Sequence, residues 1–408
     1  MAANKKVIFI TNYPIESRDA KRLGFEIWVS QNYEIQVWDI SRYYYKNLQN
    51  ITMDLYKSKN IEIFKIKKIF KIKSELKKVT KGDVVVVCGT TNKLQSVSTF
   101  LIFYLISNSQ AVFSNVLWGD LPLHNEQSLK SIASKINTLF SLKSLDIVKL
   151  MRVSYSIFWR EFSSLNFGKY KLRKIIGIKA FDFVWLGTLP DRVPKIFISE
   201  KTKFIYIHNL DFDKIIAVEE KNVRSKSSIV LLDSMGPLHT DYMAEDRLPS
   251  IGSELYSQLV RNILDKIENK FDTKVIIAAH PRTNFDICEK LYGNREVFFN
   301  QTAELISQSN AVIIIDGSTS VGFAVYWKKP IIIIKSNKFD IQTKNLNEYL
   351  IQLLNPNVID LDLPFTLENI RSADVDLYDE YFWQYVKKPN TPKKYFWQIV
   401  ISELEKIN

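Results

Sequence analysis

The chain has 408 residues, and its 56 lysines and arginines exceed its 44 aspartates and glutamates by twelve charges. Hydrophobic residues make up 46% of it, while 12 glycines and 12 prolines are too few for a collagen-like or low-complexity chain. The two cysteines, Cys88 and Cys288, exclude a disulfide framework and a four-cysteine metal site. We therefore expect a globular protein in a reducing, cytoplasmic compartment.

Hydropathy and charge limit the partners. No segment resembles a signal peptide, and the longest apolar run, Phe100–Ile106, is too short to span a bilayer. The basic excess suits an anionic partner such as a nucleotide, a membrane surface or a nucleic acid. No RRM, zinc-finger or helix-turn-helix signature is present, so a nucleic acid is not the expected partner.

Short apolar runs alternate with amphipathic stretches along the whole chain, which predicts parallel strands joined by helices. In the first half, the predicted strands are Lys6–Ile10, Ile35–Asp39, Ile61–Ile66, Asp83–Cys88, Ala111–Leu117, Phe183–Leu186 and Phe204–His208. In the second half, they include Ile229–Asp233, Val275–Ala279, Ala311–Ile315 and Pro330–Ile334.

A charged, polar stretch from Glu219 to Ser228 separates these halves and is typical of a domain linker. We predict an α/β protein with an N-terminal domain over 1–222 and a C-terminal domain over 223–385. Residues 386–408 are predicted to form a C-terminal helix that packs back on the first domain.

Several common motifs are missing. The sequence has no GxGxxG after its first strand, no GxxxxGK[ST], no HExxH and no GxSxG. The sequence therefore does not favour the enzyme classes that these motifs define: dinucleotide oxidoreductases, P-loop phosphotransferases, zinc hydrolases and esterases. We expect neither a bound metal nor a resident cofactor.

Two loops after predicted strands carry groups suited to phosphate. His280 is followed by Pro281, which fixes a turn, and by Arg282, a strong donor to phosphate oxygens. One α/β unit later, Asp316 precedes a glycine turn and three hydroxyls before a predicted helix, where amides and hydroxyls favour an anion. These loop residues are Gly317, Ser318, Thr319 and Ser320.

These motifs, with Lys329-Pro330 before an isoleucine-rich strand, resemble the C-terminal domain of bacterial glycosyltransferases. More narrowly, they resemble the enzymes that use CMP-activated sialic, pseudaminic or legionaminic acid or Kdo. The resemblance implies a GT-B fold of two Rossmann-like domains that face each other across a central cleft. It also implies an inverting, metal-independent transfer to a cell-surface glycan or a lipid-linked oligosaccharide.

Carried over residue by residue, the resemblance assigns the donor phosphate to His280, Pro281, Arg282 and the loop 317–320. Asp233, in Leu-Leu-Asp-Ser-Met-Gly, resembles the first strand-end motif of such domains. Arg18, His208, Asp211 and Asp213 are further cleft candidates.

The catalytic base is expected in the N-terminal domain, beyond a strand end. Asp19, which follows the first predicted strand, is the first candidate. Asp120 is the second, because the glycine and tryptophan beside it suit a sugar. A structural salt bridge is the alternative for Asp19.

Aromatic and basic residues between Ser141 and Lys179 suit an anionic bilayer, so we expect a peripheral position on the inner face of the cell membrane. A solvated helix pair is the alternative for that segment. For the whole protein, the alternatives are a CDP-polyol phosphotransferase, a UDP-sugar enzyme of the same fold, and a basic membrane- or nucleic-acid-binding protein without catalysis.

Overall fold

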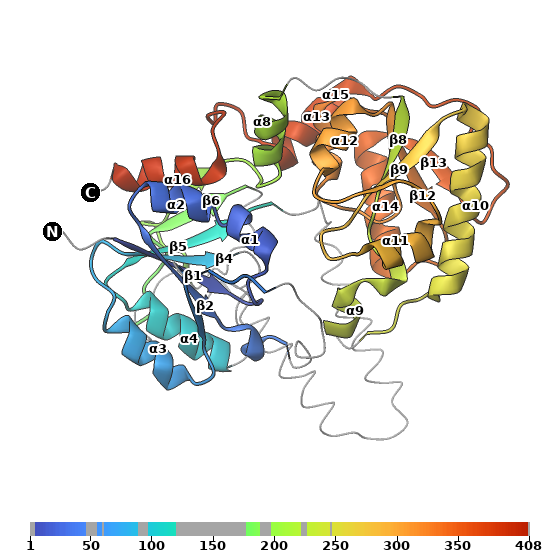
Figure 1. The fold of residues 1–408 in the computed structure, drawn as a ribbon. Coiled ribbons are helices and arrows are strands. Elements are labelled where there is room, and N and C mark those ends of the chain that lie inside the picture. Colours follow the sequence, from blue (N-terminus) through green and yellow to red (C-terminus); the bar gives the residue numbers. More distant parts are fainter. Residues whose placement is uncertain are drawn as a thin grey trace, which may run out of the picture. The chain divides into compact units, whose positions relative to one another are not determined.

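The computed structural model describes residues 5–45, 55–58, 61–88, 97–119, 177–187, 197–221, 227–244 and 247–406 (Figure 1). The chain divides into two compact units. Unit 1 comprises 1–118, 124–207 and 397–408, and unit 2 comprises 119–123 and 208–396. Each unit is described by itself.

Unit 1 is built on a parallel sheet of order β3-β2-β1-β4-β5-β6-β7. Its strands are β1 (Lys6–Thr11), β2 (Glu34–Asp39), β3 (Glu62–Lys65), β4 (Val84–Cys88), β5 (Val112–Leu117), β6 (Phe183–Leu186) and β7 (Lys203–Tyr206). The helices that accompany them are α1 (Ser17–Arg22), α2 (Phe25–Ser30), α3 (Ile69–Leu76), α4 (Val97–Ser107) and α16 (Phe396–Glu405), with a 3₁₀ turn at Ser41–Tyr43.

Side chains that alternate along β1 divide between the two faces of this sheet, as strand geometry requires. Ile8 and Ile10 belong to the core cluster that α3 and α4 cover. Phe9 points to the opposite face, where it contacts Trp28 of α2 and Trp397 of α16. Figure 1 shows α2 and α16 together over this face, so α16, although distant in sequence, completes the packing of β1.

Unit 2 is built on a second parallel sheet, of order β10-β9-β8-β11-β12-β13. Its strands are β8 (Ser228–Leu232), β9 (Lys274–Ala278), β10 (Val297–Phe298), β11 (Ala311–Ile314), β12 (Ile331–Lys335) and β13 (Asn357–Asp360). In both sheets the chain starts near the middle, builds outward on one side and then returns to build on the other. This is the Rossmann strand order, so the predicted α/β architecture of two Rossmann-like domains is confirmed.

The helices of unit 2 are α8 (Phe212–Glu219), α9 (Thr240–Ala244), α10 (Ser253–Phe271), α11 (Phe285–Tyr292), α12 (Thr302–Gln308), α13 (Val321–Tyr326), α14 (Ile341–Leu354) and α15 (Val375–Tyr381). A 3₁₀ turn covers Gly236–Leu238, and a π-helical turn at Phe382–Val386 continues α15. Helices α10 and α11 pack together against β8 and β9.

The boundary between the two units does not lie in the charged stretch Glu219–Ser228, where the sequence analysis places the domain linker. Unit 2 begins at His208, before α8, and the chain returns to unit 1 only at Trp397. The reason lies in the contacts of α8. Phe212 contacts Tyr326 and Phe382, and the backbone N–H of Asn209, just before α8, donates to the Val386 carbonyl at 2.8 Å.

Trp397 gives a direct test of the packing in unit 1. Its side chain is buried and its indole N–H donates to the Arg22 carbonyl at 2.7 Å. Trp397→Ala should therefore lower the free energy of unfolding by about 3–5 kcal/mol, measured by urea denaturation. Trp383→Ala, at a side chain that is 43% exposed, is the control and should cost less than about 1 kcal/mol. Equal losses in the two variants would contradict this account.

Candidate functional site

The strand order of unit 2 reverses between β8 and β11, which lie side by side. Ligands of open α/β sheets bind at the carboxyl ends of strands next to such a reversal. Asp233 directly follows β8, His280 follows β9 and Asp316 follows β11. The sequence-predicted phosphate loops thus lie at one edge of one sheet.

Asp233 joins the loops after β8 and β9. Its buried carboxylate accepts hydrogen bonds from the Met235 amide at 2.7 Å, the His280 amide at 2.9 Å and the Tyr292 hydroxyl at 2.7 Å. Burial, with the negative charge of Asp233 acting in the same direction, raises the pKa of the Cys288 thiol to about 11. Cys288 is therefore a packing residue rather than a nucleophile. Asp233 therefore joins the loops after β8 and β9, and its predicted role in donor binding stays a prediction.

The His280 loop is further fixed by side chains of the β8 loop. The His239 and His280 rings lie edge to face, with centroids 5.0 Å apart. Arg282 donates to Asp241 at 3.0 Å. The structure thus places His280, Arg282 and Asp233 together, and it adds His239 and Asp241 from α9 and the turn before it.

The hydroxyl loop precedes a helix, as the sequence predicts. The helix that follows it, α13, has only six residues. The Ser318 hydroxyl accepts from the Ser320 amide at 3.2 Å, and the Thr319 hydroxyl donates to Asp211 at 2.6 Å. The Thr319 O–H is thereby used within the protein, whereas Ser318 uses only its oxygen, as an acceptor. Gly317 has a packing role as well, because a Cβ there would collide with the Leu346 side chain.

Asp316 and Asp340 are acidic groups at this edge that the sequence analysis did not single out as site residues. Burial raises the pKa of Asp316 to about 6, and the nearby charge of Asp340 adds to the effect. Burial acts on Asp340 in the same direction, but hydrogen bonds from Tyr242, Thr343 and Gln342 outweigh it and hold its pKa below the ordinary value. The only sequence signal for Asp340 is that it lies in the loop after a predicted strand, as Asp233, His280 and Asp316 do.

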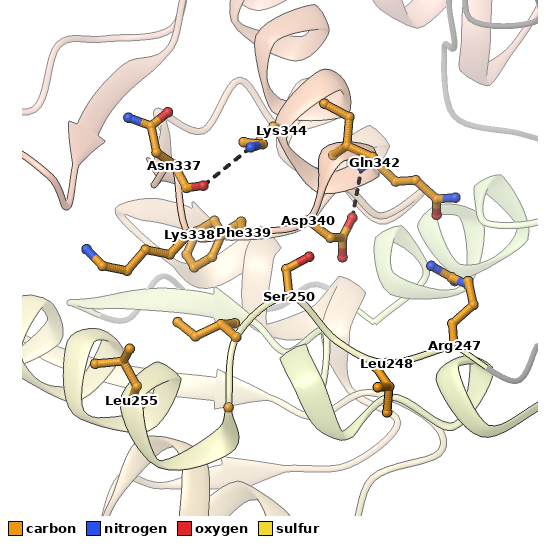
Figure 2. Close-up of a pocket in the computed structure, with 13 residues that line it drawn as sticks. Arg247, Leu248, Ser250, Leu255, Asn337, Lys338, Phe339, Asp340, Gln342 and Lys344 are labelled. Atoms are coloured by element: carbon orange, nitrogen blue, oxygen red, sulfur yellow. Dashed lines mark hydrogen bonds between the residues drawn. The ribbon is translucent and has the colours of Figure 1, made fainter. Parts of the chain in front are cut away.

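A hollow of about 720 Å³ lies beside the site, between the segment 247–255 and the start of α14 (Figure 2). Asp340, whose carboxylate also accepts from the Tyr242 hydroxyl at 2.5 Å, lies on its wall. Arg247, Lys338 and Lys344 also line it. None of the sequence-predicted site residues lines this hollow, so it is a neighbour of the phosphate loops rather than their pocket.

Three cleft candidates from the sequence serve to anchor α8 within unit 2. His208 is buried, with Nδ1 2.8 Å from the Asn209 carbonyl and Nε2 2.8 Å from the Lys394 carbonyl. Asp213 accepts from the Phe396 amide at 2.8 Å, and Asp211 is paired with Lys214. These contacts give each residue a structural role.

The base candidates have different outcomes. Asp19 accepts a hydrogen bond from the Glu16 amide at 3.0 Å in a capping box at the start of α1, and Arg18 pairs with Glu16 at 2.7 Å. Asp120 lies outside the described residues, as does nearly all of the segment 141–179 predicted to meet a membrane. The structure thus gives Asp19 a helix-capping role, which is an alternative to the predicted catalytic role.

Within the described ranges, no group of three or more histidine, cysteine, aspartate or glutamate side chains could hold a metal ion. In the same ranges, no helix combines the length and apolar character needed to cross a bilayer.

No protein-family model matches the chain, and no curated protein matches it in sequence. Solved structures similar to it include the calicheamicin glycosyltransferase CalG4, at 12% identity and a TM-score of 0.48 over 99% of both chains. A second is the H444N variant of the wall teichoic acid polymerase TagF, at 11% identity and a TM-score of 0.46 over 99% of this chain and 90% of that one. A third, described as a UDP-N-acetylglucosamine 2-epimerase from Listeria monocytogenes, has 12% identity and a TM-score of 0.43 over 100% and 97%. The narrower resemblance to CMP-sugar transferases stays a hypothesis from the sequence motifs.

Asp213 predicts a pH dependence of stability. Burial raises the pKa of its carboxyl to about 7, with Asp211 adding to the effect and the hydrogen bond from Phe396 opposing it. In the unfolded chain the value is near 3.8. Between these values the folded protein keeps a proton that the unfolded chain has released, so stability falls as pH rises from about 4 to about 7.

Asp213→Asn cannot ionise, yet its amide oxygen can still accept from Phe396. The free energy of urea unfolding of this variant should therefore fall less steeply with pH than that of the wild type. The difference should be clearest between pH 6 and 7, because Asp316, whose pKa is raised only to about 6, contributes less to the pH dependence there. The matched control is Asp374→Asn, at the carboxylate that caps α15 by accepting from the Leu377 amide. That variant should keep the wild-type slope, and an unchanged slope in Asp213→Asn would refute the assignment.

Proposed function

We propose that this protein is an inverting, metal-independent glycosyltransferase. It moves a nonulosonic acid or Kdo from a CMP-activated donor to a cell-surface glycan or lipid-linked acceptor. One observation carries the proposal: His280 and Arg282 are held by Asp233 and Asp241 at the strand-order reversal of a Rossmann-type sheet.

In the proposed reaction, an acceptor hydroxyl attacks the anomeric carbon of the donor sugar. The bond from that carbon to the phosphate oxygen breaks, and CMP leaves with the bonding electron pair. His280 and Arg282 donate to the phosphate oxygens as negative charge develops on them, which is the kind of stabilisation that fixed donors supply best. A carboxylate, Asp19 or Asp120 by the sequence analysis, takes the hydroxyl proton.

The proposed setting is the cytoplasmic face of the cell membrane, with the enzyme as a peripheral protein. The net charge of +12 supports attraction to that anionic surface. No resident cofactor is required, because the nucleotide sugar is a substrate.

A thermal-shift series with CMP, CDP, UDP and GDP tests the choice of donor. A ligand that binds only the folded state stabilises it by about 2.7 kcal/mol at one hundred times its Kd, so CMP should raise Tm the most. His280→Ala should abolish most of that rise and lower turnover about 10²-fold or more. Lys290→Ala, at an exposed cation on α11, serves as the control and should behave as the wild type.

Stronger protection by CDP would replace the proposal with a polyol-phosphate transferase, and protection by UDP would replace it with a UDP-sugar enzyme. Protection by none of them would leave a binding protein without this chemistry. Wild-type turnover in His280→Ala would remove the central support.

The proton acceptor is tested by Asp19→Asn and Asp120→Asn. A base variant should bind nucleotide with unchanged affinity and turn over about 10²-fold more slowly. If Asp19 acts only in its capping box, Asp19→Asn should keep its rate, because the amide oxygen can still accept from the Glu16 amide, whereas Asp19→Ala should lower stability by about 1 kcal/mol. Full activity in both variants would show that the proton goes elsewhere.

A further inference from the structure

The segment 65–81 of unit 1 carries most of the surplus positive charge of the chain. It comprises the end of β3, the helix α3 and the turn that follows. It contains eight lysines and one glutamate, so its net charge is +7, whereas the net charge of the whole chain is +12. All eight lysines are exposed: Lys65, Lys67, Lys68, Lys71, Lys73, Lys77, Lys78 and Lys81.

The helix α3 has an apolar inner face and a basic outer face. Ile72 is buried in the core cluster of unit 1, and Ile69 packs against that cluster. The opposite face carries Phe70, Lys73 and Lys77, which are spaced by three and four residues and therefore share one side of the helix. Figure 1 shows α3 beside α4, so its inner face is the one turned to the sheet.

Phe70 protrudes from the outer face. Its side chain is 85% exposed, whereas Val29, the next most exposed large apolar side chain described in unit 1, is 53% exposed. A single exposed apolar side chain is common on protein surfaces. The distinguishing feature here is the combination of a protruding phenyl ring with lysines on both sides of it in the sequence.

The acidic side chains of this region do not neutralise the outer face. Glu75 pairs with Lys78 at 2.9 Å. Asp83, just after the segment, is buried and accepts three hydrogen bonds. Among the described residues, no carboxylate pairs with Lys73 or Lys77. The charge beside Phe70 is therefore available to an external partner.

An anionic bilayer matches this combination of groups. Clustered lysines on an amphipathic helix are attracted to negatively charged headgroups. A phenylalanine among them can enter the boundary between the headgroups and the acyl chains, where burial of the ring adds to the attraction. Both contributions come from the same face of α3.

A nucleic acid matches it less well. All eight cations are lysines, which act as point charges and lack the planar fork with which arginine binds phosphate. Single-stranded nucleic acids are held by several aromatic side chains that stack on successive bases. Phe70 is the only aromatic residue of the segment 65–81, so such a row of rings is missing there.

We propose that the outer face of α3, with the exposed lysines of the segment 65–81, is a docking surface for an anionic lipid bilayer, and that Phe70 inserts between the headgroups. This docking surface deepens the membrane setting of the proposed function and rests on it. It lies in a different part of the chain from the segment 141–179, where the sequence analysis expects the membrane contact.

Flotation of the full chain with lipid vesicles measures this binding. One set of vesicles contains phosphatidylcholine and phosphatidylglycerol in equal parts, and the other contains phosphatidylcholine alone. Phe70→Ser removes the ring, and the double variant Lys73→Gln/Lys77→Gln removes two charges from the same face. Because these side chains are exposed, both variants should unfold in urea as the wild type does.

Matched controls lie in unit 2. Phe285→Ser removes a phenylalanine that is 58% exposed at the start of α11. Lys266→Gln/Lys270→Gln removes two exposed lysines of α10 that are also four residues apart. Both control variants should bind vesicles as the wild type does.

The wild type should bind the anionic vesicles and not the neutral ones, and added salt should weaken the binding because it screens exposed charges. Phe70→Ser should bind about tenfold more weakly. The double lysine variant should lose about tenfold or more. Equal binding in the test and control variants would overturn the proposal, and so would equal binding of neutral vesicles. Binding of a single-stranded oligonucleotide in place of vesicles would overturn it in favour of a nucleic-acid surface.

A spin label tests directly whether residue 70 enters the bilayer. Cys88 and Cys288 are buried, so a nitroxide reagent should label Phe70→Cys selectively. Anionic vesicles should shield this label from a water-soluble paramagnetic relaxant. A label at Val29→Cys, on α2 at the opposite face of the sheet, should stay accessible. A label at residue 70 that stays accessible in the vesicle-bound protein would refute the insertion.

Failure of the docking surface can be told apart from failure of the proposed function. If vesicles bind in the predicted order of variants while no nucleotide raises Tm, the docking surface stands and the transferase proposal fails. If CMP raises Tm while the α3 variants bind vesicles as the wild type does, the transferase proposal stands and the docking surface fails.

Discussion

The carboxylate of Asp233 is the contact on which the candidate site depends. Besides the Cys288 thiol at 3.7 Å, three groups donate to it: the Met235 amide, the His280 amide and the Tyr292 hydroxyl. A carboxylate accepts at both oxygens and donates at neither, so it can satisfy all three, whereas an asparagine would turn an N–H toward another donor. Because this carboxylate is buried, an unmatched donor there could not be rescued by solvent. The β8 and β9 loops are thereby locked to each other before any ligand arrives, which is the preorganisation that binding of a small anion requires.

Much of this architecture could be predicted from the sequence because its signals are local. Buried parallel strands are short apolar runs, and every one of the eleven predicted runs overlaps a strand. Two strands were missed. Val297–Phe298 has only two residues, and Asn357–Asp360 alternates with polar side chains at the edge of its sheet, so neither forms an apolar run. The sequence indicates the strand-end residues Asp233 and His280 because a turn residue or a polar cluster follows each buried run.

The roles of other residues could not be read locally, because their partners lie far along the chain. Asp213 pairs with an amide 183 residues away, His208 with a carbonyl 186 residues away, and Thr319 with a carboxylate 108 residues away. Their sequence context shows a polar residue after a strand, which is the same context as that of a ligand-binding residue. The pairing of His239 with His280 is likewise a property of two adjacent strands, and no spacing in the sequence indicates it.

The return of the chain to unit 1 has a consequence for synthesis on the ribosome. The strand β1 and helix α2 emerge early, but Trp397, which covers Phe9 and Trp28, is made almost 370 residues after Trp28 and after all of unit 2. Domains made of one continuous segment can complete their folding as they emerge. Here the aromatic face of the first sheet stays without Trp397 until all of unit 2 has been translated. Unit 1 thus starts to fold before unit 2 and finishes after it, and a nascent chain stalled within unit 2 would present that face to chaperones.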